Sequence, residues 1–371
     1  MSELDKCKKL GFGLMRLPQN ENGFDVPQIE KMVDEFISAG CTYFDTAWIY
    51  PGSEEVTRKV LVERYPREKF LLATKLAPWS KCKCREDALQ QFYDSLSRTG
   101  AGYFDYYLLH NLGENRTRIF DDFKLWDFAL EQKAKGLIRH LGFSFHSTAD
   151  ELEKILQDHP EMEFVQLQIN YADWEDEKVQ SRRCYEVARK YGKPVIVMEP
   201  VKGGLLAAPP ENISSLMKAA DPERSCASWA IRFAASLPGV MTVLSGMSTL
   251  EQMRDNLSFM ADFREFDEKE KALVDRASVM LRSSKMIPCT ACNYCAKECP
   301  ENIGIAGTFD AMNMLYLYNN HPAAVNKEHW SVVVPGKARA AKCIGFGKCE
   351  KVCPQHIKIR EFLAQAAKEF P

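Results

Sequence analysis

The chain has 371 residues, of which 46% are hydrophobic and 27% are charged, and its formal net charge is −2. This balance is ordinary for a globular protein and gives no positive field for a nucleic acid, so we expect no nucleic-acid partner. The most apolar stretch, residues 229–246, is interrupted by Arg232 and Pro238, and the first twenty residues contain many charges. The sequence therefore predicts neither a signal peptide nor a membrane span, and we expect a cytoplasmic protein.

Thirteen cysteines are present, and seven of them fall between residues 289 and 353. Without an export signal, cysteines are expected to remain thiols, either as metal ligands or as small buried hydrophobic residues. The change in cysteine density indicates a domain boundary near residue 284. Because a chain of this length suggests one large domain and one small domain, we place them at residues 1–283 and 284–371.

In the first 280 residues, short β-rich runs alternate with segments of helical periodicity. The runs give eight strand-then-helix units, the number that closes a parallel (β/α)8 barrel. An open doubly wound sheet is the alternative, but no run is followed by the Gly-x-Gly-x-x-Gly turn of dinucleotide-binding sheets. We therefore predict an α/β fold with a TIM barrel. The predicted strands lie within residues 10–17, 42–45, 70–75, 106–110, 138–144, 164–170, 195–200 and 242–246.

The segments between these runs show signals for helix starts and ends. Apolar residues at helical spacing over residues 29–37 stop at Gly40, a common C-terminal signal. Thr148 begins a capping-box pattern, which predicts a helix start. Asp221 followed by Pro222 predicts another helix start at that point.

Nearly every predicted strand ends in a polar residue. In a barrel these strand ends gather at one rim, where the active site of such enzymes lies. Polar loops explain one or two such residues, but an Asp, a Lys and a His directly after buried runs are costly unless they pair. The strand-end residues are Asp45, Lys75, His110, Ser144, Gln166, Gln168, Glu199 and Ser245.

The segments "YFDTAWIY", "LLATK" and "YYLLH" resemble the aldo-keto reductase family, whose catalytic tetrad is an Asp, a Tyr five residues later, a Lys and a His. The matching positions are Asp45, Tyr50, Lys75 and His110, in the same order. The segments "GFSFHS", "EPVKGG" and "GMSTLEQMRDN" extend the resemblance over about residues 9–260. The resemblance implies an oxidoreductase that uses NAD(P)H to interconvert a carbonyl and an alcohol.

Carbonyl reduction needs these residue types on chemical grounds. Hydride arrival puts negative charge on the carbonyl oxygen, so a proton donor is required, and Tyr50 is expected to be this acid. A free phenol has a pKa of roughly 10, and a nearby cation makes its proton more available. Lys75 would be that cation, held by Asp45, while His110 would donate to the substrate oxygen. A buried ion pair with a satisfied histidine is the purely structural alternative.

The resemblance also implies contacts to the nicotinamide cofactor. Ser144 and Gln166 match positions that hold the carboxamide, and Met198 stands where many members stack a Tyr on the ring. The last barrel loop would receive the cofactor phosphates on backbone N–H groups. No basic residue follows in this region before Arg254, which favours NADH slightly. The implied phosphate-binding residues are Gly246, Met247, Ser248 and Asn256.

The segment "CTACNYCAKECP", residues 289–300, has the C-x-x-C-x-x-C-x-x-x-C-P spacing of bacterial ferredoxins. Zinc is the alternative, because paired C-x-x-C units bind it too. The third evenly spaced Cys and the final Cys-Pro favour an iron-sulfur cluster. In two-cluster ferredoxins the fourth Cys of each run serves the other cluster. The resemblance to them implies one complete 4Fe-4S cluster held by Cys289, Cys292, Cys295 and Cys353.

The second run, "CIGFGKCEKVCP", has Phe346 where the repeat requires a Cys. A benzyl group cannot bind iron, so Cys299, Cys343 and Cys349 supply three thiolates to the second site. This site would hold a 3Fe-4S cluster, a 4Fe-4S cluster with one non-protein ligand, or no cluster. In the last case the thiols would pack as small hydrophobic residues.

One main hypothesis and two alternatives follow for the whole chain. The main hypothesis is a carbonyl–alcohol oxidoreductase barrel joined to a small α+β ferredoxin-like domain. In the first alternative, the chain passes electrons between a nicotinamide and a redox partner protein. A hydride carries two electrons and a cluster accepts one, and no flavin motif is present to divide them. From residue 284 onward, eleven basic and seven acidic residues give a local charge of +4, which would offset anionic clusters. In the second alternative, the clusters only stabilise the fold.

Overall fold

A computed structural model of the chain describes residues 8–113, 116–284, 286–318 and 320–370. The chain divides into two compact units, which are described separately. The first comprises Met1–Pro200 and Ala227–Glu268, and the second comprises Val201–Cys226 and Lys269–Pro371. The second unit therefore includes two segments that were expected in the barrel domain. In the described part of the chain, no helix combines the length and the apolar character that crossing a membrane requires.

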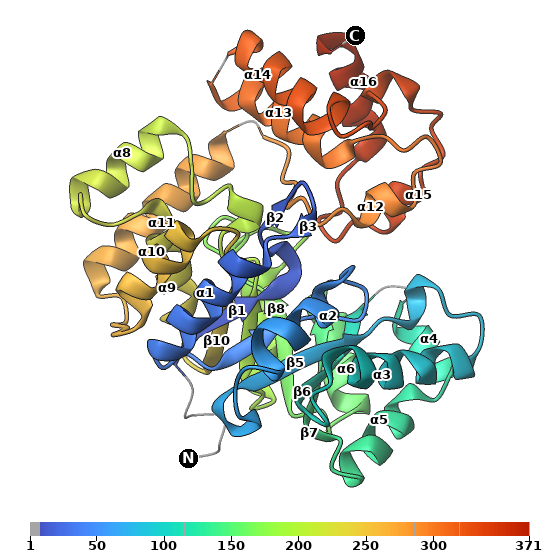
Figure 1. The fold of residues 1–371 in the computed structure, drawn as a ribbon. Coiled ribbons are helices and arrows are strands. Elements are labelled where there is room, and N and C mark those ends of the chain that lie inside the picture. The colour runs from blue at the N-terminus through green and yellow to red at the C-terminus, as the bar shows by residue number, and fades with distance from the viewer. Residues whose placement is uncertain (1–7, 114–115, 285, 319, 371) are drawn as a thin grey trace. The chain divides into compact units, whose positions relative to one another are not determined.

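Eight parallel strands close into a barrel, in the order β1-β10-β9-β8-β7-β6-β5-β4, and β4 pairs again with β1 (Figure 1). The predicted (β/α)8 barrel is confirmed, and each of its strands falls in a segment where the sequence predicts one. The strands are β1 (Leu10–Gly13), β4 (Tyr43–Asp45), β5 (Leu71–Leu76), β6 (Phe104–Leu112), β7 (Ile138–Phe145), β8 (Phe164–Gln168), β9 (Val195–Met198) and β10 (Val240–Ser245).

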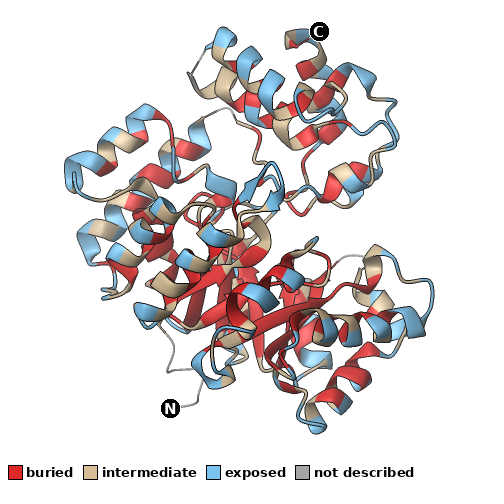
Figure 2. Cartoon of the chain, viewed as in Figure 1, coloured by how far each residue is buried: buried red, intermediate tan, exposed pale blue. Residues whose placement is uncertain are grey.

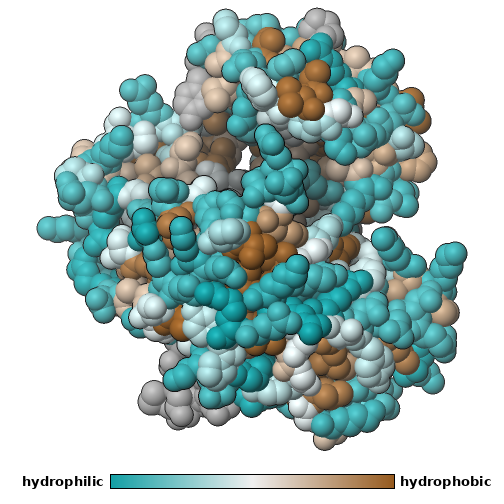
Figure 3. Space-filling model, in the orientation of Figure 1, coloured by the Kyte–Doolittle hydropathy of each residue, from teal (hydrophilic) through white to brown (hydrophobic). Residues whose placement is uncertain are grey.

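Apolar side chains fill the barrel and explain why these runs form strands. Parallel strands are covered on both faces, so they consist of nearly continuous apolar residues. Figure 2 shows the buried residues concentrated in the strands, whereas the face visible in Figure 3 is mainly hydrophilic with small apolar patches. Tyr43, Tyr106 and Ile196 belong to the interior cluster. Gly142 of β7 is required by close packing, because a Cβ there would lie 2.4 Å from the carbonyl oxygen of Phe164.

Helices and short turns connect the strands of the first unit. A short hairpin, β2 (Gln19–Asn20) with β3 (Gly23–Phe24), was not predicted from the sequence. The helices are α1 (Val26–Ser38), α2 (Ser53–Thr57), α3 (Arg85–Thr99), α4 (Thr117–Asp122), α5 (Leu125–Ala134), α6 (Ala149–Asp158), α7 (Ser181–Lys190), α9 (Cys226–Ala235) and α10 (Leu250–Met260). The shorter turns are η2 (Leu14–Arg16), η3 (Arg58–Val62), η4 (Arg67–Lys69) and η5 (Pro78–Ser80).

The structure confirms the helix start after Thr148 and contradicts the one at Asp221, and neither residue forms the predicted side-chain cap. Thr148 does precede α6, but its side chain makes no capping hydrogen bond, because Ser147 Oγ donates to Glu151 Oε2 at 2.6 Å instead. Asp221 ends helix α8 rather than beginning a new one. Its carboxylate forms an ion pair with Arg224 at 2.7 Å, which closes a turn before α9. In both cases a local side-chain partner replaces the predicted cap.

The second unit is helical, and its cysteine-rich part has a small apolar core. Helices α12 and α15 contact each other, and α13 contacts both α14 and α16. Phe309, Met312, Ile357 and Leu363 lie in the core of the cysteine-rich part. The helices and turns are η7 (Lys202–Gly204), α8 (Glu211–Ala220), α11 (Glu268–Ser283), α12 (Tyr294–Lys297), α13 (Ile305–Tyr318), α14 (His321–Glu328), η8 (His329–Val333), η9 (Ala340–Lys342), α15 (Lys348–Lys351) and α16 (Ile359–Glu369).

The expectation of an α+β fold for this region is corrected. Within residues 286–318 and 320–370, the β-structure is one isolated bridge between Ile303 and Ala338. Helices occupy the chain between the two cysteine runs, so no extended segments remain to pair. Gly203 lies against the first run within the same unit, because a Cβ at Gly203 would lie 2.5 Å from the carbonyl oxygen of Thr290.

Candidate active site and cluster sites

The four residues predicted as a catalytic tetrad meet at the carboxyl ends of β4, β5 and β6. Lys75 Nζ donates to Asp45 Oδ1 at 2.5 Å and to the carbonyl oxygen of Thr46 at 2.7 Å. The same nitrogen lies 5.3 Å from the centre of the Tyr50 ring. The rings of Tyr50 and His110 are arranged edge to face, with their centres 6.0 Å apart. The structure thus brings all four predicted side chains together.

The charged pair of this site is buried. Asp45 is 4% exposed and Lys75 is 1% exposed. Burial raises the pKa of Asp45 and lowers the pKa of Lys75, because it disfavours both charged forms. Their mutual attraction opposes both shifts, and Glu54 also favours the charged lysine. Gln166 Nε2 donates to Asp45 Oδ2 at 3.2 Å. The two charges therefore compensate each other within the protein, and the pair is held in place by hydrogen bonds.

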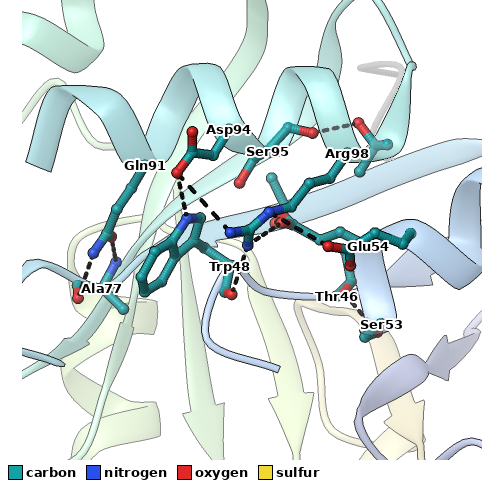
Figure 4. Close-up of polar contacts among 12 residues, drawn as sticks. Thr46, Trp48, Ser53, Glu54, Ala77, Gln91, Asp94, Ser95 and Arg98 are labelled. Atoms are coloured by element: carbon teal, nitrogen blue, oxygen red, sulfur yellow. Dashed lines mark hydrogen bonds and ion pairs between the residues drawn. The ribbon is translucent and has the colours of Figure 1, made fainter. Parts of the chain in front are cut away.

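A second polar network holds the loop that carries Tyr50 (Figure 4). Glu54 is buried at the start of α2, where it accepts a hydrogen bond from Thr74 Oγ1 at 2.7 Å. Arg98 of α3 lies 3.4 Å from the other carboxylate oxygen of Glu54. Arg98 also donates to the carbonyl oxygen of Trp48 at 3.4 Å and lies over its ring, 5.2 Å from the ring centre. Helix α3 therefore fixes the chain on both sides of Tyr50.

The histidine and the predicted carboxamide-binding residues are also supported by neighbours. Trp79 Nε1 donates to the carbonyl oxygen of His110 at 2.8 Å. The backbone N–H of Asn111 donates to Ser144 Oγ at 2.7 Å. Ser144 and Gln166 are adjacent in the paired register of β7 and β8, and both are buried. Met198, expected at the nicotinamide ring, ends the next strand, β9. Their roles toward a nicotinamide stay predictions.

The predicted phosphate-binding loop follows β10, and two of its backbone N–H groups already have side-chain partners. The N–H of Ser248 donates to Gln252 Oε1 at 2.8 Å, and the N–H of Leu250 donates to Gln28 Oε1 at 3.2 Å. Asn256 is buried and donates through Nδ2 to a strand hydroxyl, Ser245 Oγ, at 2.8 Å. Gly246 and Met247 complete this loop, and the Met247 side chain is buried. These two N–H groups are therefore not available to an anion while those hydrogen bonds persist.

Arg16, Glu54 and Arg98 were not recognised as site residues from the sequence. Glu54 stands next to Glu55, and Arg98 is a single charge in a predicted helical segment, so both looked like ordinary helix surface. Arg16 was expected within the first strand, whereas the strand ends at Gly13 and Arg16 lies in the turn that follows. A basic residue directly after a barrel strand was the signal that could have placed it at the rim.

The thiols predicted to hold the first cluster gather around Cys295. Burial raises the pKa of this buried thiol, and the nearby thiols of Cys292, Cys289 and Cys353 raise it further. The backbone N–H of Ala291 donates to Cys289 Sγ at 3.4 Å, and hydrogen bonds of this type tune cluster sulfurs. In the described parts of the chain, no three His, Cys, Asp or Glu side chains converge on one metal ion. A 4Fe-4S cluster does not require such convergence, because each thiolate binds a different iron.

The second cysteine run repeats the first at an offset of 54 residues, in its backbone as well as in its sequence. Ala291 and Asn293 have left-handed φ values of 55° and 61°, and the matching Gly345 and Gly347 have values of 74° and 79°. A four-residue helix follows each loop, α12 in the first run and α15 in the second. The second loop therefore keeps the conformation of the first, although Phe346 replaces Cys292.

The three remaining thiols, those of Cys299, Cys343 and Cys349, line one open cavity. Phe346 lies at the cavity wall and is 61% exposed. The other lining residues are mostly apolar, so the cavity offers three sulfur ligands in an apolar surrounding. They are Glu298, Pro300, Glu301, Ile303, Ile305, Ile344, Gly347 and Leu363.

Known proteins match both parts of the chain. Residues 9–279 match the aldo/keto reductase family, and residues 288–358 match a 4Fe-4S dicluster domain. An uncharacterized oxidoreductase of Bacillus subtilis, YqkF, is 25% identical over 301 residues, which cover 73% of this chain and 93% of that protein. An aldo-keto reductase of Mycolicibacterium smegmatis is 29% identical over 144 residues, 39% of this chain and 48% of that protein. The chain thus spans about half the length of the latter relative.

Solved structures share the barrel. An aldo-keto reductase from Klebsiella pneumoniae in complex with NADPH has a TM-score of 0.59 and 22% identity, over 73% of this chain and 90% of that chain. The holo form of an aldo-keto reductase from Bacillus halodurans has a TM-score of 0.58 and 22% identity, over 72% and 91%. These likenesses concern the fold. The match over residues 9–279, on a closed eight-stranded barrel with the tetrad at its rim, shows that the chain belongs to the aldo/keto reductase family and carries a 4Fe-4S dicluster domain after the barrel.

Proposed function

We propose that this chain interconverts an aldehyde or ketone and the corresponding alcohol, with NADH or NADPH as the hydride carrier. The observation that carries the proposal is the buried Lys75–Asp45 pair, with its ammonium group 5.3 Å from the Tyr50 ring. A charged pair in this position is costly to bury, and it serves the reaction by stabilising the tyrosine after it loses its proton. The nicotinamide supplies the hydride when bound.

Each tetrad residue has one task in this proposal. Tyr50 gives its phenolic proton to the carbonyl oxygen as the hydride arrives, and it takes the proton back when the alcohol is oxidised. Lys75 stabilises the resulting phenolate, and Asp45 keeps the lysine in position. His110 donates a hydrogen bond to the substrate oxygen, which orients the carbonyl in a site with little water.

The cofactor contacts belong to the same proposal. Ser144 and Gln166 hold the carboxamide, Met198 lies against the ring, and the loop after β10 lies at the phosphates. NADH is preferred slightly, because the first basic residue after that loop, Arg254, forms a bidentate pair with Glu35. The ratio of kcat/KM for the two cofactors tests this preference, and a strong preference for NADPH would contradict it.

Turnover of a panel of aldehydes and ketones, followed by the loss of nicotinamide absorbance, tests the activity. The full-length protein is expected to reduce at least one class of carbonyl, and Lys75→Met is expected to lose that turnover. Lys81→Met, which changes an exposed lysine in the loop after β5, serves as the matched control and keeps it. Absence of turnover in either direction, in protein that binds the cofactor, would refute the proposed activity.

For the cysteine-rich region we propose two iron-sulfur centres in a cytoplasmic protein, where thiols stay reduced. Cys289, Cys292, Cys295 and Cys353 hold a complete 4Fe-4S cluster. The three thiols at the cavity hold a second centre, a 3Fe-4S cluster, because the second loop keeps the cluster-binding conformation. Iron and sulfide analysis with paramagnetic resonance on anaerobically assembled protein tests this. Four irons per chain with a single paramagnetic species would show that the second site is empty.

Electron transfer to a redox partner protein is a second candidate role. The retained loop conformation in both cysteine runs and the local charge of +4 from residue 284 onward support it. Addition of NADH to anaerobic protein is then expected to bleach the visible absorbance of the clusters. Unchanged absorbance would favour clusters that only stabilise the fold.

A further inference from the structure

We propose that Arg16 binds the diphosphate group that NADH and NADPH share. This inference rests on the nicotinamide site proposed above. Arg16 ends turn η2, directly after the first barrel strand, and reaches two other strand ends at the rim. Its guanidinium group is therefore placed by tertiary structure rather than by a sequence motif.

The contacts of Arg16 place it between the ends of β9 and β10. Nη2 lies 3.5 Å from Glu199 Oε1, beyond the end of β9. Nη1 lies 3.8 Å from the position that a Cβ would take at Gly246, after β10. The backbone carbonyl oxygen of Arg16 accepts a hydrogen bond from Ser248 Oγ at 2.7 Å, which ties the turn to the loop. The side chain is 31% exposed, so an anion can reach it.

This position matches the path of a dinucleotide diphosphate. Glu199 directly follows Met198, the residue expected at the nicotinamide ring, and Gly246 begins the loop expected at the phosphates. The diphosphate connects the nicotinamide half of the cofactor to the adenosine half, so it must pass between these two segments. Arg16 lies beside both of them. A guanidinium group is suited to this task, because its planar fork binds two phosphate oxygens at once.

Three other donors near this loop are engaged by side chains of the protein. The N–H groups of Ser248 and Leu250 donate to side-chain oxygens of the protein, as described above. Arg254 is held by Glu35 of α1 through both carboxylate oxygens. Glu199 is itself fixed, because its backbone has a left-handed φ of 56° and its carbonyl oxygen accepts from Asn170 Nδ2 at 3.1 Å. It can therefore keep the guanidinium at the rim until the anion binds.

Binding measurements with the full-length protein test this role without requiring turnover. Dissociation constants for NADH, NADPH and ADP-ribose are measured by calorimetry. Arg16→Leu is expected to raise all three by the same factor, about tenfold to a hundredfold, the range for a lost charge-assisted hydrogen bond. Arg16→Lys keeps the charge but not the fork, so a smaller increase is expected. Raising the salt concentration should weaken NADH binding more in the wild type than in Arg16→Leu.

Arg254→Leu is the matched control and should leave all three constants unchanged. An effect of Arg16→Leu on NADPH alone would overturn the proposal and assign Arg16 to the 2′-phosphate instead. Equal binding by Arg16→Leu and the wild type would also overturn it. If the wild type binds none of the three ligands, the proposed function fails rather than the role of Arg16. If Arg16→Leu does not fold, the test rests on Arg16→Lys and on the salt dependence of NADH binding by the wild type. Unchanged dissociation constants in Arg16→Lys together with salt-independent binding would then overturn the proposal.

Discussion

In the barrel site, two side chains of opposite charge compensate each other, whereas in the proposed cluster sites the positive charge that compensates the thiolates comes from bound metal. In the barrel, Asp45 and Lys75 are buried together, and each provides the charge that the other needs. In the cysteine-rich region, the thiols of Cys295 and Cys349 are buried beside other thiols, and burial raises the pKa of both. Metal binding is what deprotonates such ligands and couples them to folding. The polypeptide alone prepares the first site, whereas the second kind of site is completed by its metal.

The largest effect is expected from Tyr50→Phe in the barrel site. If this substitution had no effect, the barrel side chains would not be the reactive groups that distinguish this site from the cysteine sites. In the proposed reaction Tyr50 is the acid, so kcat/KM for carbonyl reduction should fall by about 10²–10⁴-fold, the contribution of a positioned acid. Affinity for the nicotinamide and the melting temperature should stay unchanged, because only one oxygen atom is lost. Tyr93→Phe, on the surface of α3, is the control and should retain full turnover. Unchanged turnover of Tyr50→Phe would remove Tyr50 from its role.

Cys295→Ser should damage the cysteine-rich region and spare the barrel. The iron content should fall by about four per chain, since the first cluster loses its most buried ligand. Limited proteolysis should then cut within residues 288–370, because metal binding contributes folding energy there. Cys84→Ser, at an exposed cysteine of the barrel unit, should change neither result. An unchanged cleavage pattern in the iron-poor protein would show that the fold of this region does not depend on the metal.

Exchange of residues between the two cysteine loops tests whether position 346 can hold a cluster ligand as position 292 does. Because the loops share one backbone conformation, Phe346→Cys should supply a fourth thiolate and raise the iron content by about one per chain. Cys292→Phe should have the opposite effect on the first cluster. Val334→Cys adds an exposed cysteine that does not line the cavity, and it should leave the iron content unchanged. Equal iron contents in all four proteins would show that position 346 does not face a cluster.

The smallest effect concerns a second internally compensated charge of the barrel unit, Glu163. Burial disfavours its ionised form, but hydrogen bonds from His140, Lys133 and the N–H of Leu141 outweigh this and lower its pKa from 4.5 to about 2. The ionised form therefore stabilises the fold fully above about pH 4.5, and this contribution is lost as the pH falls toward 2. Urea unfolding at pH 5 and pH 3 should show a smaller drop in unfolding free energy for Glu163→Gln than for the wild type. An equal drop would contradict the assignment.

The barrel was predictable from the sequence because its strands are buried on both faces and end in polar rim residues. The tetrad was predictable because three of its positions follow apolar runs and Tyr50 stands at a fixed spacing from one of them. Arg16 was not recognised, since its neighbours Glu199 and Gly246 are far away in sequence and meet it only when the barrel closes. Local pattern also failed at Asp221, where an ion pair with Arg224 replaced the predicted cap.

The cysteine grouping was predictable for a different reason. The ligand spacing is local and repeats after 54 residues, so the pairing of Cys353 with the first run followed from the resemblance to ferredoxins. The helical character of the region was not predictable from that spacing. It is determined by the insertion between the runs, where α13 contacts α12 of the first run and α14 packs against α13. A motif of ligands specifies the metal site but not the chain that connects its halves.

The packing of Gly203 against Thr290 joins the segment around residue 203 to the first cysteine run. Residues 201–226 and 269–283 form one compact unit with the cysteine-rich tail, although the family match includes residues 201–226 and 269–279. A chain shortened at residue 283 would lose the surface on which the loop around Gly203 rests. The cysteine-rich tail is therefore not an independent domain. Its transfer to another barrel would require residues 201–226 to be transferred as well.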